Sequence, residues 1–190
     1  MSKFMQQSFF PHPKPKREHG GSLSTGKRRL TRPLNLKLSH HITMKSHHAI
    51  GTRSLFRHKK LILGLIRKNA YRFQVKVIEY AIQGNHIHLL VKGQTRVGLQ
   101  NLFRVVAGHS AQKILQSFPI NKQQAGGASN KAKGCRKNQR KFWSFLLYSR
   151  VVSWGRDFKN VVAYIQKNTL ELLKIIAYQS RVKRKKVNSS

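Results

Sequence analysis

The stretch "FQVKVIEYAIQGNHIHLLVKG", residues 73–93, decides the fold. Its first half alternates apolar and polar residues, as a strand with one buried side does. After the short connection "QGN" at residues 83–85, a second apolar run begins at His86. Two strands joined by so short a connection form an antiparallel hairpin. The stretch therefore predicts two neighbouring antiparallel strands, and the second of them carries two histidines.

The two histidines, His86 and His88, share one face of the second strand because side chains alternate along a strand. Ile87, Leu89 and Val91 then point to the other face, which we expect to pack against helices. Two imidazoles on one face can converge on a metal ion, since neutral histidine is the commonest metal ligand. Two structural histidines with hydrogen-bond partners are the alternative, and the strand alone does not decide between the two.

The sequence around the hairpin predicts the element order β-α-β-β-α-β-α. Alternation predicts a first strand at 33–46, and apolar residues at helical spacing predict helices at 54–73 and 97–115. A further strand is predicted at 141–152 and a last helix at 156–179. The first six elements form the ferredoxin-like arrangement of an α+β fold, an antiparallel sheet with two helices on one face. The last helix is then free to cover the other face.

The last helix carries two polar residues at helical spacing. We expect its core stripe to consist of apolar residues: Phe158, Val162, Ile165, Leu172 and Ile176. Tyr164 and Asn168 are four residues apart and share a face that is rotated away from this stripe. They could face the histidine pair across the sheet. The alternative is an aromatic residue at the boundary of the core and a solvated amide.

The charge balance of the chain restricts its partners. The 190 residues contain 39 Lys and Arg against 4 Asp and Glu, a formal charge of +35. Nucleic acid is the leading partner, because phosphate neutralisation with counterion release drives such binding. We find no apolar run of membrane-spanning length, no secretory signal in residues 1–20 and only one cysteine, Cys135. We therefore expect a cytoplasmic, nucleoid-associated protein without a membrane partner or a disulfide framework.

The two ends of the chain differ in composition from its middle. Residues 1–32 are rich in Pro, Gly, Ser, Lys and Arg, which indicates a flexible basic arm, and residues 178–190 indicate a basic tail. Between them we expect a single domain at 33–177. A stretch without periodicity at 118–140 predicts a basic loop insertion in this domain.

Several of these stretches together resemble one family. "GNHIHLLVKG" at 84–93 and "LQNLFRVVAGHSAQKI" at 99–114 are followed by "FWSFLLYSRVV" at 142–152 and "VVAYIQKN" at 161–168. In this order they resemble the HUH single-tyrosine transposases, which are insertion-sequence-200-like, and among these the REP-associated tyrosine transposases. The resemblance runs from about position 33 to about position 177 and agrees with the predicted order of elements.

The resemblance implies a DNA transposase that cleaves and rejoins single-stranded or hairpin DNA through a 5′-phosphotyrosine intermediate. It implies that Tyr164 is the catalytic nucleophile, and that His86, His88 and Asn168 bind a divalent metal, Mg²⁺ or Mn²⁺. A phenol is a weak nucleophile at neutral pH because its unperturbed pKa is about 10, so a cation that polarises the scissile phosphate assists the attack. Tyr164 could act within one chain or across a homodimer.

Weaker predictions concern the remaining cations and histidines. Arg150 and Lys167 are the cations that we expect nearest to the site, and we predict that they contact nucleic acid. We expect His40 to pack inward and His41 outward, without a zinc site. The alternative function is a non-catalytic basic module that binds nucleic acid, either a domesticated transposase or an RNA-binding domain.

Overall fold

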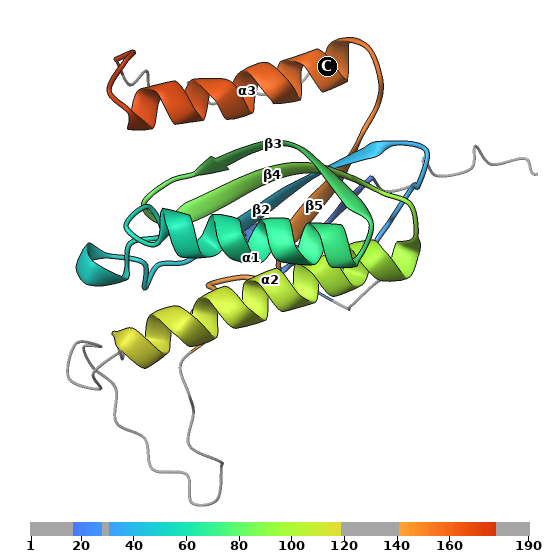
Figure 1. The fold of residues 1–190 in the computed structure, drawn as a ribbon. Helices are drawn as coiled ribbons and strands as arrows, with labels where there is room; N and C mark the ends of the chain where they lie inside the picture. Colours follow the sequence, from blue (N-terminus) through green and yellow to red (C-terminus); the bar gives the residue numbers. More distant parts are fainter. Residues whose placement is uncertain (1–16, 28–30, 119–140, 178–190) are drawn as a thin grey trace, which may run out of the picture.

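The structure is a computed structural model that describes residues 17–27, 31–118 and 141–177. Its elements are β1 (Glu18–His19), η1 (Ser22–Ser24), β2 (Ser39–Lys45), η2 (Gly51–Arg53), α1 (Lys59–Arg72), β3 (Val75–Ile82), β4 (His86–Gly93), α2 (Arg96–Ser117), β5 (Tyr148–Val152) and α3 (Arg156–Leu172). The strands form one sheet in the order β1-β5-β2-β4-β3, and all neighbouring strands are antiparallel. Helices α1 and α2 cover one face, and α3 covers the other (Figure 1). The predicted ferredoxin-like α+β fold is confirmed.

The predicted hairpin forms one side of this sheet, with β3 at the edge and β4 next to it. Strand β3 pairs with β4 from Val75 opposite Gly93 to Ile82 opposite Ile87. The backbone N–H of Gln83 donates to the carbonyl of His86 at 2.9 Å and closes the turn. Strand β4 also pairs with β2, so it is central and has both faces covered by helices.

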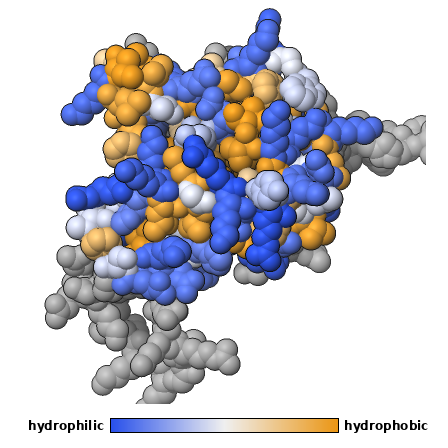
Figure 2. All heavy atoms as spheres, viewed as in Figure 1, coloured by the Kyte–Doolittle hydropathy of each residue, from blue (hydrophilic) through white to orange (hydrophobic). Residues whose placement is uncertain are grey.

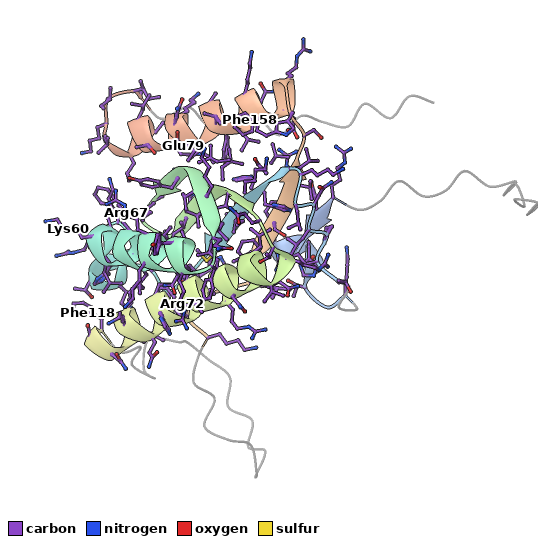
Figure 3. The ribbon with its side chains drawn as sticks, turned by 45° about the vertical axis from the view of Figure 1, so that its right-hand side comes forward. Lys60, Arg67, Arg72, Glu79, Phe118 and Phe158 are labelled. Atoms are coloured by element: carbon purple, nitrogen blue, oxygen red, sulfur yellow. The ribbon has the colours of Figure 1, made fainter. Side chains whose placement is uncertain are left out.

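The main hydrophobic core lies between the sheet and helices α1 and α2. Strand β4 contributes Ile87, Leu89 and Val91, which are at most 2% exposed, as the alternation predicted. The helices contribute fully buried side chains: Ile62, Ile66, Leu99, Leu102 and Ile114. The opposite side of α1 is basic and exposed, and it carries Lys60, Arg67 and Arg72 (Figure 3). Hydrophilic side chains accordingly dominate the α1 and α2 layer in the space-filling view (Figure 2).

The first predicted strand is shorter than expected. We predicted a strand over residues 33–46, but β2 begins at Ser39. The side-chain Oδ1 of Asn35 accepts from the backbone N–H of Lys37 at 3.0 Å, and its carbonyl accepts from Leu38 at 3.2 Å. Asparagine favours such local turns because its side chain competes for backbone donors. Residues 34–38 therefore form a turn despite their alternation.

The last predicted strand is also shorter, because β5 begins at Tyr148 rather than at residue 141. The segment before it bonds to other parts of the fold. The N–H of Ser144 donates to the carbonyl of Lys45 at 3.0 Å, and the indole of Trp143 donates to the carbonyl of Ala107 at 2.7 Å. The apolar residues of this segment thus cover the end of the sheet and α2 instead of extending a strand.

Strand β1 was not expected, since its residues fall in the segment interpreted as a basic arm. It pairs with β5 through Glu18 opposite Arg150 and His19 opposite Ser149. The rest of the predicted arm up to residue 16, nearly all of the predicted insertion at 118–140 and the predicted tail at 178–190 lie outside the described residues. Within the described ranges, none of the helices is both long and apolar enough to cross a membrane.

Candidate active site

The two histidines of β4 lie on the face of the sheet that α3 covers. His88 is 4% exposed and His86 is half-buried. Their rings meet edge to face with centroids 4.8 Å apart. On the neighbouring strand β2, Thr43 lies opposite His88 and Lys45 lies opposite His86. Alternation along β4 thus places both imidazoles on one side, as predicted.

Hydrogen bonds at Nδ1 hold both imidazoles. Nδ1 of His88 lies 3.1 Å from the Thr43 hydroxyl oxygen and 3.2 Å from Nε2 of His41. Nδ1 of His86 lies 2.6 Å from Oδ1 of Asn85. Partners on one ring nitrogen fix the tautomer and orientation of a histidine, and they are the usual outer contacts of histidines that bind metals through the other nitrogen. In both rings, Nε2 would be the metal-binding atom.

A third histidine, His41 of β2, belongs to the same cluster and was missed from the sequence. Its ring stacks on His88 with centroids 5.3 Å apart and an angle of 21° between the planes. We expected His41 to point outward, but it is only 9% exposed. Burial lowers the pKa of His41 to about 4, and the nearby charge of Arg150 adds to this effect, against a smaller opposite effect of Asp157. His41 is therefore a neutral hydrogen-bonding partner at physiological pH.

Tyr164 of α3 lies over this cluster. Its ring meets His88 edge to face at a centroid distance of 5.2 Å and His41 at 6.0 Å. Tyr164 is half-buried and packs partly against the small apolar cluster between α3 and the sheet. The structure therefore brings the predicted nucleophile and the predicted histidine pair together within one chain.

The buried stripe of α3 differs from the predicted one. The buried residues of the helix are Val161, Ile165 and Asn168, whereas Phe158 and Val162 are only partly buried. The helix is therefore rotated from the expected orientation, and this rotation brings Tyr164 to the edge of the contact face. The predicted stripe was wrong in this respect, whereas Tyr164 does face the histidine pair, as one of the two alternatives expected.

Helix α3 also ends earlier than predicted, at Leu172 rather than near residue 179. Lys174 adopts a left-handed backbone conformation with φ of 57°. The N–H groups of Leu173 and Lys174 donate to the carbonyls of Thr169 and Glu171, as at a capped helix end. Two apolar residues beyond this point, Leu173 and Ile175, are exposed. Figure 2 shows an apolar patch at this end of α3.

Asn168 is fixed one turn after Tyr164. It is 1% exposed. Its Oδ1 accepts from Nε2 of Gln83 at 2.8 Å, and its Nδ2 donates to the carbonyl of Tyr164 at 2.8 Å. Because Gln83 also closes the turn at His86, it connects Asn168 to the end of β4 that carries this histidine. Gln83 thus fixes the orientation of the Asn168 amide oxygen, the atom that the sequence predicted as the third metal ligand.

Arg150 and Lys167, the predicted nucleic-acid contacts, both form ion pairs within the protein. Arg150 donates to the two carboxylate oxygens of Asp157 at 3.0 and 3.1 Å. Burial raises the pKa of Asp157, but the hydrogen bonds from Arg150 and from the N–H of Ser153 outweigh this effect and hold it below its usual value. Lys167 lies 3.9 Å from Glu171. Phosphate would have to compete with these carboxylates.

A cavity of about 610 Å³ opens beside the cluster. His41, His88 and Tyr164 form one part of its lining, and Lys45 lies on the same side. Six residues of β1 and the segment after it form part of the lining as well: Glu18, His19, Gly20, Gly21, Ser22 and Ser24. The volume is within the range of ~300–1,000 Å³ that is common for small-molecule sites.

Comparison with known families identifies the chain. The family model described as "Transposase IS200 like" matches residues 38–168, from the start of β2 to Asn168. The chain belongs to the IS200-like transposase family. The family predicted from the sequence is thereby confirmed, and a transposase that acts on DNA is the function that this membership supports.

The fold agrees with that of a solved structure. A REP-associated tyrosine transposase bound to a REP hairpin is similar with a TM-score of 0.52 and 10% identity, over 76% of this chain and 73% of that chain. A protein of Deinococcus radiodurans R1 that is assigned as a transposase gives a TM-score of 0.40 and 13% identity, over 74% of this chain and 98% of that one. A search among curated proteins gave no match.

Proposed function

We propose that this transposase cleaves and rejoins single-stranded or hairpin DNA through a covalent link to Tyr164. The observation that carries the proposal is the position of Tyr164, whose ring lies 5.2 Å from that of His88 in the same chain. A nucleophile held beside two histidines is suited to phosphoryl transfer, because such catalysis consists mainly of positioning and charge stabilisation.

The reaction follows from the chemistry of the phenol. The Tyr164 oxygen forms a bond to the scissile phosphorus and loses its proton, while the bond from phosphorus to the 3′ oxygen breaks. The 3′ oxygen takes up a proton and leaves as a hydroxyl, and the 5′ end remains on Tyr164. Attack by another 3′-hydroxyl reverses these changes and joins two strands without an external energy source.

The residues around Tyr164 fit a divalent metal. Among the described residues, no three His, Cys, Asp or Glu side chains are arranged to hold a metal ion, so a third ligand has to be of another type. Asn168 supplies an amide oxygen, and His86 and His88 supply Nε2 atoms in rings that Asn85 and Thr43 orient. Mg²⁺ or Mn²⁺ bound there would polarise the scissile phosphate, and mixed nitrogen and oxygen ligands favour Mn²⁺ over Mg²⁺.

The arrangement favours action within one chain. Tyr164 and the histidine pair come from α3 and β4 of the same molecule, so a monomer contains every residue of the proposed site. A homodimer remains a prediction that the proposed chemistry does not require. Lys45, which lies opposite His86 on β2, is a further cation for the phosphate.

The test is a covalent adduct. The full chain is incubated with single-stranded hairpin DNA of REP type and Mn²⁺, and denaturing gels should show a protein–DNA adduct that chelator prevents. Tyr164→Phe should abolish the adduct. Tyr71→Phe is the matched control, because Tyr71 is 91% exposed on α1, and it should react as the wild type does. Binding without any adduct in the wild type would favour the non-catalytic module.

A further inference from the structure

The chain contains 4 acidic residues, and three of them lie outside the lining of the cavity beside the candidate active site. Asp157 pairs with Arg150, and Glu171 pairs with Lys167. Glu79 lies on β3 beneath α3 (Figure 3), where its carboxylate accepts from Nε2 of Gln166 at 3.1 Å. The fourth, Glu18, lines the cavity beside the candidate active site. A carboxylate is unexpected there, because a DNA-binding cavity of a chain with charge +35 would be expected to attract phosphate.

The segment that carries Glu18 is held firmly against β5. The carbonyl of Arg17 accepts from the backbone N–H of Val151 at 2.9 Å, and the N–H of Gly21 donates to the carbonyl of Leu146 at 2.8 Å. Gly20 has a φ of 79°, and a Cβ at this position would lie 2.1 Å from the carbonyl oxygen of Leu147. Only glycine fits so close an approach, so the backbone fixes where Glu18 lies.

Glu18 has a defined partner in the cavity, Tyr148 of β5. The Tyr148 hydroxyl hydrogen-bonds to the Glu18 side chain. Burial raises the pKa of Tyr148 to about 12, and the Glu18 charge and hydrogen bond add to this, against a smaller effect of Arg150. The hydroxyl therefore keeps its proton and donates to Glu18. A carboxylate offers about four lone-pair positions, so it can accept from a ligand as well.

The remaining walls suit a flat ring. Phe145 and Tyr148 line the cavity together with His47, whose ring meets Phe145 edge to face at 5.6 Å. Aromatic side chains are the usual surfaces on which unpaired bases stack. An acceptor group beside aromatic walls is suited to a nucleobase rather than to a phosphate.

We propose that this cavity binds an unpaired nucleobase of the DNA substrate, and that Glu18 selects a base with an exocyclic amino group. The inference rests on the proposed function, because the cavity adjoins Tyr164 and would place the base near the scissile phosphate. Glu and Asp accept from the amino group of cytosine in known readout, whereas thymine presents a carbonyl at the same position. Glu18 is then a specificity-determining residue, and thymine is the base that it disfavours.

The test measures base preference without cleavage. Fluorescence anisotropy of the full chain is recorded without divalent metal, with single strands of oligo-dC and oligo-dT about ten nucleotides long, within the usual site size for such strands. Moderately high salt screens the sequence-independent attraction. We expect oligo-dC to bind at least about fivefold more tightly than oligo-dT, which is the lower end of what one base-specific contact provides.

Glu18→Gln should reduce this ratio to about one, because an amide also donates and no longer disfavours thymine. Glu79→Gln is the matched control, because it removes the same charge outside the cavity. It should strengthen the binding of oligo-dC and oligo-dT equally and leave the ratio of their affinities unchanged. Tyr148→Phe is a second variant, and the loss of its hydroxyl should weaken the preference in part.

An unchanged ratio in Glu18→Gln, or no preference in the wild type, overturns the inference. These outcomes are independent of the proposed function, which the Tyr164 adduct tests separately. An adduct with normal yield and no base preference would leave the transposase mechanism standing without a role for Glu18.

Discussion

The two faces of the sheet differ in what they bury. Beneath α1 and α2, strands β2 and β4 present mainly large apolar side chains, such as Ile42 and Ile87. Beneath α3, the same strands present His41, Thr43 and His88 beside a much smaller apolar cluster. In β4, Ile87, Leu89 and Val91 therefore pack in the main core, while His86 and His88 lie on the opposite side, at the candidate site. Substitutions at neighbouring positions should therefore separate stability from activity.

The largest effect is expected for His88→Ala. It removes an imidazole that lies between Thr43, His41 and Tyr164, and it should abolish the covalent adduct on gels. The thermal unfolding midpoint should change far less than in a core variant, because the main core on the other face is untouched. A full adduct yield in His88→Ala would contradict the assignment of this face as the active one.

Ile87→Ala tests the opposite face one residue away. Ile87 is 0% exposed, and truncation of such a core side chain typically lowers the free energy of unfolding by about 2–5 kcal/mol. Urea unfolding should show this loss, while the folded variant at low temperature should still form the adduct. If Ile87→Ala abolished the adduct in a fully folded sample, the two faces would not be separable.

A smaller effect is expected for Thr43→Val, which keeps the shape of the side chain but removes the hydroxyl at Nδ1 of His88. Loss of such an orienting contact commonly lowers metal affinity by about 10–100-fold. Calorimetric titration of the DNA-free protein with Mn²⁺ measures this directly. Thr52→Val, at an exposed position in η2, is the control and should bind Mn²⁺ as the wild type does.

The smallest effect at neutral pH is expected for His40→Gln. Burial, with a contribution from Arg32, lowers the pKa of His40 to about 4, and its Nε2 accepts from the N–H of Asn35. The unfolded state thus binds more protons than the folded state between about pH 6.5 and pH 4, so stability falls as the pH falls through this window. His40→Gln should flatten this part of the unfolding curve. A curve identical to that of the wild type would show that His40 does not titrate on unfolding.

The sequence predicted the elements whose signals are local. Alternation in residues 73–93 gave the hairpin and the shared face of His86 and His88, and four-residue spacing put Tyr164 and Asn168 on one face of a helix. The boundaries at Ser39 and Tyr148 were missed, because hydrogen bonds made by Asn35 and by Trp143 and Ser144 override alternation there.

Some contacts were decided only by the tertiary structure. His41 reaches His88 because β2 and β4 pair in one register, and Gln83 holds Asn168 because α3 packs with a particular rotation. Glu18 lines the cavity only because β1 pairs with β5 across more than a hundred residues of sequence. Side-chain alternation is a property of each strand by itself and can be predicted from the sequence. Strand register and helix rotation depend on the packing of distant segments, so only the folded chain determines them.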